Sequence, residues 1–252
     1  MENKIESGVQ LFSRINSRKG DLSNLTKNLL GEDNLQNMNV EIVSDYATDR
    51  NSLILDFIIR CILPTDVNPC WKNCGVIFIN TTFQIGVLQV IKTIDRHLKD
   101  LNVKHRSGII ESSLKNLFIL NCYDKAQLEI TIYSLEDKIR EQPNIGCLIF
   151  DDITSFYWIQ KLENEMLSTY TYSLKVFNNI VTAIKGFNLF FLFGRTENNE
   201  IYHDKRLSQN VDYHLTLSMK DINNYEAKVQ SYKSNTVNVV TFSYNNFKIF
   251  FN

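Results

Sequence analysis

Residues 44–51 occupy the position where many nucleotide-binding folds hold phosphate, between the first strand-like apolar run and an apolar helix. A phosphate-binding loop needs glycines, so that backbone N–H groups can surround the phosphates, followed by Lys and Ser/Thr for charge and Mg²⁺. This octapeptide has no glycine and ends in Arg50 and Asn51. Asp45 and Asp49 add negative charge that opposes a phosphate. Residue chemistry alone therefore favours an ordinary strand-to-helix turn.

A second candidate is the acidic pair Asp151 and Asp152, which follows the apolar run 147–150. An acid at the end of a buried strand is a common way to position magnesium, which prefers oxygen ligands. The same pattern also occurs where a buried strand simply reaches the surface. The pair alone does not decide between these interpretations.

The remaining candidates offer less specific chemistry. The aromatic run 156–159 predicts core or interface packing, since base stacking needs basic neighbours and Lys161 alone is close. The polar segment 194–212 mixes both charges and predicts a mobile, solvated loop rather than a phosphate-tracking one. Cys70 and Cys74 have no second ligand pair for zinc. The four histidines are scattered and accompany no evident nucleophile.

Composition narrows the function classes. The chain has 252 residues, with 27 Lys+Arg against 28 Asp+Glu and a formal charge of −1, which excludes a simple electrostatic nucleic-acid binder. A hydrophobic share of 44% excludes a disordered chain. Five irregularly spaced cysteines do not suggest a disulfide framework. We expect a soluble intracellular protein, because we find neither a secretory signal nor an apolar run of membrane-spanning length.

From Val40 onward, short apolar runs alternate with helical periodicity, which predicts an α/β fold with a mostly parallel sheet flanked by helices. The predicted strands are 40–43, 75–80, 117–120, 147–150 and 188–193. The predicted helices lie within 53–63, 87–101, 128–139 and 174–184. Apolar and polar residues then alternate over 240–244 and 247–251 around Asn245 and Asn246, which predicts a C-terminal antiparallel hairpin at one sheet edge.

Six segments, in this order and spacing, resemble the RecA-like paralogues of the eukaryotic strand-exchange recombinase. They are ESGVQL at 6–11, RCILP at 60–64, VIFINT at 76–81, YSLE at 133–136, LIFDD at 148–152 and SFYWI at 155–159. The resemblance covers most of the chain, from about Glu6 to the end of the last buried strand. RCILP and SFYWI are its most specific pieces.

The resemblance implies a RecA-like P-loop ATPase core over 39–252, including the C-terminal hairpin, preceded by an N-terminal helix and linker segment over 1–38. It also implies a nuclear role in homologous-recombination repair of DNA double-strand breaks, as one subunit of a complex of recombinase paralogues. The D-type paralogue is the expected direct partner. Single-stranded or branched DNA is expected to bind through the assembled complex, and no membrane is involved.

The departures from the family pattern bear on activity. The Gly-rich loop of the family maps onto 44–51, with Arg50 in place of the lysine and Asn51 in place of the hydroxyl residue. The planar arginine head cannot replace a compact ammonium in a tight loop. Thr82 stands where active recombinases carry a catalytic glutamate, and Asp151 alone matches a functional position. The degenerate nucleotide-site positions are Ser44, Thr48, Asp49, Arg50, Asn51 and Asp151.

Two functions follow as alternatives. The first is a non-catalytic interaction subunit, with no catalytic residue, no metal ligand and no cofactor, in which the segment around Val9, Leu11 and Phe12 docks on a partner. The second is a DNA-dependent ATPase that binds ATP and Mg²⁺ weakly through Arg50 and Asp151 in an unusual geometry.

Overall fold

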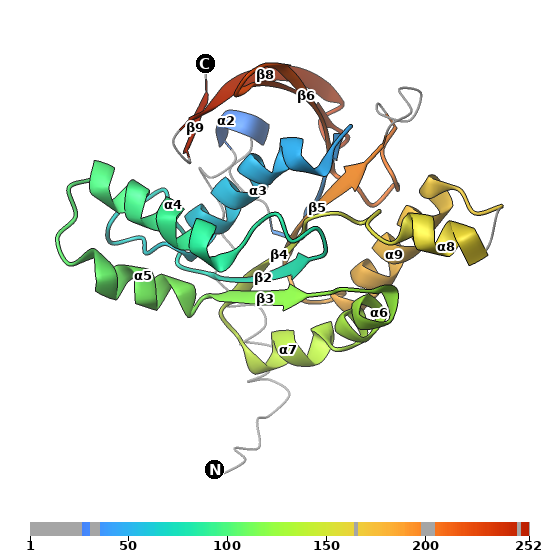
Figure 1. Cartoon of the computed structure of the whole chain (residues 1–252), viewed down its shortest axis with the longest axis horizontal. Coiled ribbons are helices and arrows are strands. Elements are labelled where there is room, and N and C mark those ends of the chain that lie inside the picture. The colour runs from blue at the N-terminus through green and yellow to red at the C-terminus, as the bar shows by residue number, and fades with distance from the viewer. Residues whose placement is uncertain (1–26, 31–35, 164–165, 198–204, 246–247, 252) are drawn as a thin grey trace, which may run out of the picture.

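One nine-stranded sheet organises the computed structural model, which describes residues 27–30, 36–163, 166–197, 205–245 and 248–251. The strand order is β3-β2-β4-β5-β1-β6-β7-β8-β9 (Figure 1). The strands from β3 to β6 in this order are mutually parallel, and the last three continue the sheet in antiparallel pairs. The predicted α/β class with a mostly parallel sheet is therefore confirmed.

The parallel strands coincide with the predicted apolar runs. β2 and β4 are buried at every residue, as expected for parallel strands that are covered on both faces. All five predicted strands are present, and β6 is a sixth parallel strand that the sequence pattern did not predict. The bounds are β1 Asn39–Ser44, β2 Gly75–Asn80, β3 Leu117–Asn121, β4 Ile145–Phe150, β5 Phe190–Thr196 and β6 Tyr213–Asp221.

Helices cover both faces of the sheet and bury two separate apolar cores (Figure 1). On one face lie α3 Ala47–Ile62, α4 Val87–Asp100 and α5 Arg106–Leu114. On the other lie α6 Lys125–Tyr133, α7 Leu135–Glu141, α8 Tyr157–Glu163 and α9 Thr169–Ala183. The helix α3 ends as predicted before Pro64, because a residue that precedes proline avoids the helical region. Leu63 accordingly has ψ 146°.

Two helical details differ from the sequence prediction. The periodicity over 128–139 predicted one helix, but the structure divides it at Ser134 into α6 and α7. The apolar face itself is confirmed, since Leu128, Ile132, Leu135 and Ile139 are all buried. The helix α5 was not predicted because Ser113 is its one buried residue, which leaves almost no apolar stripe in the sequence.

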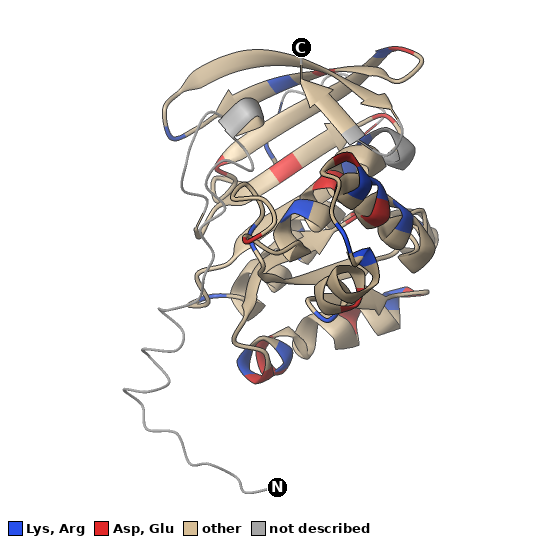
Figure 2. Cartoon of the chain, turned by 90° about the vertical axis from the view of Figure 1, so that its left-hand side faces the viewer, with Lys and Arg blue, Asp and Glu red and all other residues tan. Residues whose placement is uncertain are grey.

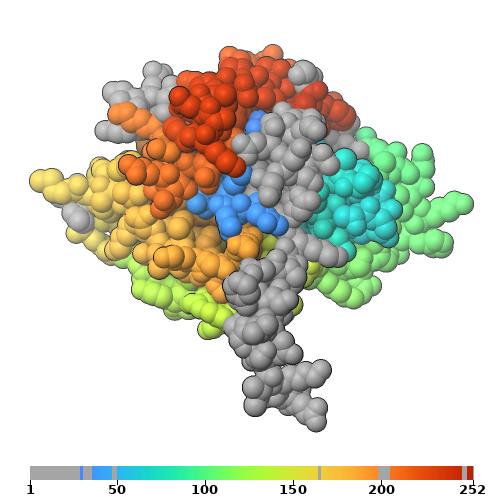
Figure 3. All heavy atoms as spheres, turned by 180° about the vertical axis from the view of Figure 1, so that it is seen from behind, coloured from blue at the N-terminus to red at the C-terminus, as the bar shows by residue number. Residues whose placement is uncertain are grey.

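The C-terminal strands form an antiparallel extension. β8 Thr236–Asn245 and β9 Lys248–Phe251 are the predicted hairpin, and β7 Asn224–Ser231 joins them to β6. The β6–β7 and β7–β8 turns contain Asn223 (φ 66°) and Asn235 (φ 54°), and asparagine tolerates this left-handed conformation. Seen from behind, the orange and red end of the chain forms the top of the molecule (Figure 3).

The N-terminal part is described only in short pieces. The helix α2 Lys27–Leu30 buries Leu29 and Leu30 in the core that also contains β7 residues, so part of the predicted linker packs on the core. The predicted helix around Val9, Leu11, Phe12 and Ile15 lies outside the described residues. The domain boundary at 38/39 stays a prediction. Within the described ranges, each helix is too short or too polar to cross a bilayer.

Candidate functional site

The carboxyl ends of β1, β2, β4 and β5 meet at one edge of the sheet, where open α/β folds bind ligands. Three of the predicted site residues come together there. Ser44 ends β1, Arg50 lies in the first turns of α3, and Asp151 follows β4. The structure places these three residues side by side and shows what each side chain contacts.

Arg50 is fully buried and is the centre of this cluster. Its Nε donates to the Asp151 carbonyl oxygen at 2.9 Å, and its Nη1 donates to Ser44 Oγ at 2.9 Å. Both Nη atoms also contact Thr196 Oγ1, at 3.1 and 3.2 Å, and Nη2 pairs with Asp152 Oδ2 at 2.7 Å. A guanidinium has five N–H donors, and these five contacts use all of them. Arg50 therefore joins the ends of β1, β4 and β5.

Gly194 on β5 makes room for this arginine. A Cβ atom at position 194 would overlap Arg50 Nε and the Asp151 carbonyl oxygen, far inside van der Waals contact. The backbone oxygen cannot move away as the end of a flexible side chain would. Glycine is the residue that lets the guanidinium pass β5 at this point.

Asp151 is saturated by hydrogen bonds from its own chain. Its carboxylate accepts from the backbone N–H groups of Thr81, Thr82 and Asp152, at 2.7–3.0 Å. It also accepts from Thr81 Oγ1 at 2.6 Å and from Thr82 Oγ1 at 2.7 Å. Asp151 thus anchors the turn after β2, and a metal ion could bind it only by displacing these donors.

Asp152, which the sequence analysis did not choose as a site residue, is the buried counter-ion of Arg50. Its Oδ2 also accepts from Thr196 Oγ1 at 2.6 Å, and its Oδ1 accepts from the backbone N–H of Thr154 at 2.8 Å. The second acid in the sequence was the available signal for this role. Successive side chains of a strand point in different directions, so two adjacent acids can have different partners.

The other predicted positions contribute less. The helix α3 already begins at Ala47, so 44–51 contains a short connection and one helical turn rather than a wrapping loop. Asn51 Oδ1 is buried without a hydrogen-bond partner in the described part of the chain. The side chains of Thr48 and Asp49 lie outside what the structure describes. Within the described residues, we find no group of three His, Cys, Asp or Glu side chains that could hold a metal.

A second buried polar cluster, which the sequence analysis missed, joins β1, β5 and β6. Arg195 Nε pairs with Glu41 Oε1 at 2.6 Å, while Glu41 Oε2 lies 2.9 Å from His214 Nδ1. The backbone N–H of Leu207 donates to the same Oε2 at 3.0 Å. Burial alone raises the pKa of Glu41, but Arg195 and His214 outweigh it and hold that pKa below its ordinary value. A glutamate inside the apolar run 40–43 was the available signal, because a buried charge needs a partner.

This cluster corrects one prediction. The segment 194–212 was expected to be a mobile, solvated loop, but β5 continues to Thr196, and Arg195 is 1% exposed. Leu207 and Val211 are buried as well, while 198–204 lie outside the described residues. Some charged residues of this segment form buried ion pairs, such as Arg195 with Glu41 and Glu197. The prediction from charge composition therefore overestimated the solvent exposure of the segment.

The aromatic run after β4 divides between core and surface. Phe156 and Tyr157 are buried as packing predicts, whereas Trp158 and Ile159 are exposed on α8. Lys161 Nζ lies 5.6 Å from the ring centroid of Tyr157 and 5.7 Å from that of Trp158.

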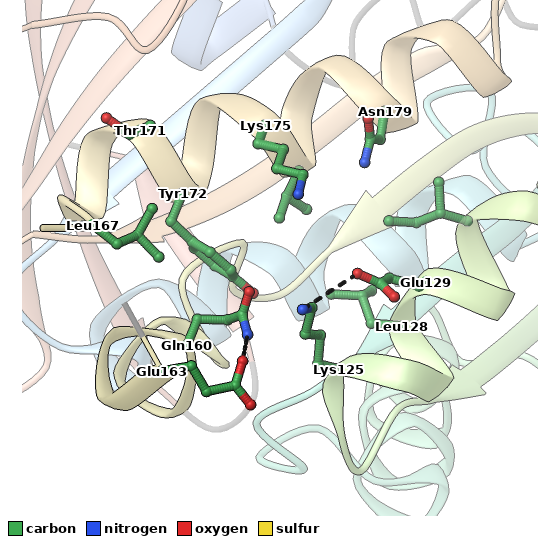
Figure 4. A pocket seen from close by; sticks show the side chains of 12 residues that line it. Lys125, Leu128, Glu129, Gln160, Glu163, Leu167, Thr171, Tyr172, Lys175 and Asn179 are labelled. Atoms are coloured by element: carbon green, nitrogen blue, oxygen red, sulfur yellow. Dashed lines mark hydrogen bonds and ion pairs between the residues drawn. The ribbon is translucent and has the colours of Figure 1, made fainter. Parts of the chain in front are cut away.

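A cleft of about 180 Å³ lies between α6, α8 and α9 (Figure 4). Leu128, Ile132, Tyr172 and Val176 are its buried hydrophobic residues, and burial raises the pKa of Tyr172. Its polar residues are partly paired with one another, with Lys125 Nζ 3.7 Å from Glu129 Oε1. None of the predicted site residues lines this cleft, so it supports no role in the predicted chemistry.

Surface charge is mixed. Lys and Arg alternate with Asp and Glu on the helices seen in Figure 2. The alternation agrees with the formal charge of −1.

The mostly parallel sheet flanked by helices, with antiparallel strands at its C-terminal end, is consistent with a RecA-like fold. No protein-family profile matches the chain. The chain is 26% identical over 161 residues to the DNA repair protein XRCC2 of Mus musculus, a RecA-like paralogue. The match covers 63% of this chain and 55% of the mouse protein, so it spans little more than half of that relative. The resemblance to the RecA-like paralogues that the sequence segments predicted is thereby confirmed.

Proposed function

We propose that this chain is a non-catalytic subunit of a recombinase-paralogue complex, which acts in the nucleus in homologous-recombination repair of DNA double-strand breaks. The similarity to a DNA repair protein supports the repair role. The observation that carries the non-catalytic part is the buried Arg50, whose five donors are all used inside the chain.

The Arg50 cluster opposes nucleotide binding on three grounds. A phosphate could bind the guanidinium only by displacing Asp152 and the hydroxyl groups, which would leave a buried carboxylate unpaired. The Asp151 carboxylate already accepts from five donors, three backbone N–H groups and two hydroxyls, which leaves little capacity for Mg²⁺. Thr82, at the position of the family's catalytic glutamate, donates its hydroxyl to Asp151 and cannot act as a general base. Phosphoryl transfer needs positioned cations and an oriented water.

The complex partners follow from the resemblance. The D-type paralogue is the proposed direct partner, and DNA is proposed to bind the assembled complex. Because the chain has a net charge of −1, few phosphates can be neutralised by the isolated chain.

Calorimetric titration of Mg-ATP into the purified chain tests the non-catalytic role. We expect no binding heat at millimolar nucleotide. Saturable, Mg²⁺-dependent heat that disappears in Asp151→Asn would instead support the alternative, a DNA-dependent ATPase with an unusual nucleotide geometry.

Co-expression with the D-type paralogue tests complex membership, and size-exclusion chromatography should give one joint peak. In cells that lack the chain, Thr82→Ala should restore resistance to DNA cross-linking as well as the wild type does. Loss of rescue by a Thr82→Ala chain that still assembles would argue for catalysis at this position.

A further inference from the structure

We propose a nucleobase-binding site at the carboxyl ends of β2 and β3, formed by Phe83, Tyr123 and Asn121. The rings of Phe83 and Tyr123 are stacked, with centroids 4.6 Å apart and an interplanar angle of 12°. They are nevertheless 43% and 66% exposed. In the described part of the chain, the other stacked pairs each include a fully or nearly fully buried ring. An exposed stack offers an outer face to a further planar ring.

Hydrogen bonds from the strand ends hold this stack in place. Phe83 has φ 57°, which is uncommon for a bulky side chain and costs conformational energy. Its backbone N–H donates to Asn80 Oδ1 at 3.1 Å, and Asn80 Nδ2 donates to Asn121 Oδ1 at 2.9 Å. The backbone N–H of Tyr123 donates to Gln127 Oε1 at 2.9 Å. These hydrogen bonds fix the backbone at Phe83 and Tyr123, and the two rings pack on each other.

The hollow beside the stack fits a flat heterocycle. Its volume is about 240 Å³, and Phe83, Asn80 and Asn121 line it, whereas Tyr123 stacks on Phe83 without lining the hollow. The apolar side chains that complete it are Ile85, Val87 and Ile119. Asn121 is exposed, and its Nδ2 makes no hydrogen bond to any other described residue. An aromatic wall with a free amide edge is the combination that recognises unstacked bases.

The charges near the stack favour the base over the phosphate. Asp124 accepts from the Gln127 N–H at 2.8 Å as the N-cap of α6, and Lys125 is paired with Glu129. Neither sign dominates, so few counterions would be released on binding. We expect weak binding that depends on stacking and changes little with salt concentration. The inference does not rest on the subunit role proposed above, because neither complex assembly nor nucleotide hydrolysis enters its test.

Ultraviolet cross-linking of the full chain to a short single strand that carries 5-iodouracil tests the site. We expect an adduct on Phe83, the ring that lines the hollow, mapped by mass spectrometry, and an affinity about tenfold lower in Phe83→Ala. Tyr123→Phe, which keeps the ring, should bind as the wild type does. The control is Tyr133→Ala, because Tyr133 is an 83% exposed tyrosine at the end of α6 that does not line the hollow and should be neutral.

Competition identifies the source of the base. If free adenosine removes the adduct, the site accepts a single nucleoside, and if only an unlabelled strand does, the base must belong to a polymer. Both outcomes support a base site. Adducts confined to other segments, or equal affinity of Phe83→Ala and the wild type, would overturn it.

Discussion

Arg50→Ala should strongly destabilise the fold, because it removes the cation from a cluster that stays buried. Asp152 would keep its charge with a side chain that is 7% exposed, and Ser44, Thr196 and the Asp151 carbonyl would each lose a donor. Removing one partner of a buried ion pair costs about 3–5 kcal/mol. That is a large share of the roughly 5–15 kcal/mol that a domain typically has.

A graded series separates charge from geometry. Arg50→Lys keeps the charge but cannot supply five donors in a fork. Its free energy of unfolding should therefore lie between those of the wild type and Arg50→Ala. In the double variant Arg50→Met, Asp152→Asn, neither partner of this ion pair keeps its charge. Its loss of unfolding free energy should therefore be smaller than the sum of the losses in the single variants Arg50→Met and Asp152→Asn.

Urea unfolding at pH 7, followed by circular dichroism, measures these differences at constant m value. Lys115→Ala is the control, since its ion pair with Glu111 is exposed and should contribute nothing measurable. The reasoning is refuted if Arg50→Ala costs less than about 1 kcal/mol, well below the range for a broken buried pair, or if the single losses simply add in the double variant.

Three further outcomes test other parts of the structure. The pKa of Glu41 is lower in the folded chain than its ordinary 4.5, so this residue contributes stability above pH 4.5 that is lost as pH falls through the folded value. Unfolding free energies measured across this range should therefore depend less on pH in Glu41→Gln. Iodoacetamide should label the exposed Cys70 quickly, while Cys61 and Cys74, whose pKa values burial and neighbouring thiols raise, should react only after unfolding, as mass spectrometry would show. Ser168→Ala removes the N-cap of α9, whose Oγ accepts from the Thr171 N–H at 3.0 Å, and should cost about 1 kcal/mol in the same urea assay. No change in Ser168→Ala would mean that this cap is dispensable.

The parallel strands were predictable because burial on both faces leaves continuous apolar runs, such as 147–150 in β4. The strands β6 and β7 were missed because each has one polar face and therefore no continuous apolar run. His214, Thr216 and Ser218 alternate strictly with the apolar positions of β6, so a period-two strand signal was present in the sequence and was overlooked. The hairpin β8–β9 was found because its alternation includes large aromatic residues.

The candidate site was predicted as a set of positions but not as a set of contacts. The sequence placed Ser44, Arg50 and Asp151 at one edge of the sheet because strand ends meet there. It could not show that Arg50 contacts residues 101 and 146 positions away, nor that Asp152 is its counter-ion. Such pairings depend on the order of strands in the sheet, which local periodicity does not encode.

The contact between Arg50 and Gly194 also constrains the order in which this chain can have evolved. A side chain at 194 and the guanidinium at 50 exclude each other sterically, so the effect of each substitution depends on the other. An ancestor with a larger residue at 194 had to acquire glycine before, or together with, the buried arginine. Replacing Arg50 would not by itself free position 194, because a Cβ atom there would still lie 2.1 Å from the Asp151 carbonyl oxygen. Glycine at 194 is therefore a precondition for the buried arginine, and the approach of β4 to β5 would keep that glycine even if the arginine were lost.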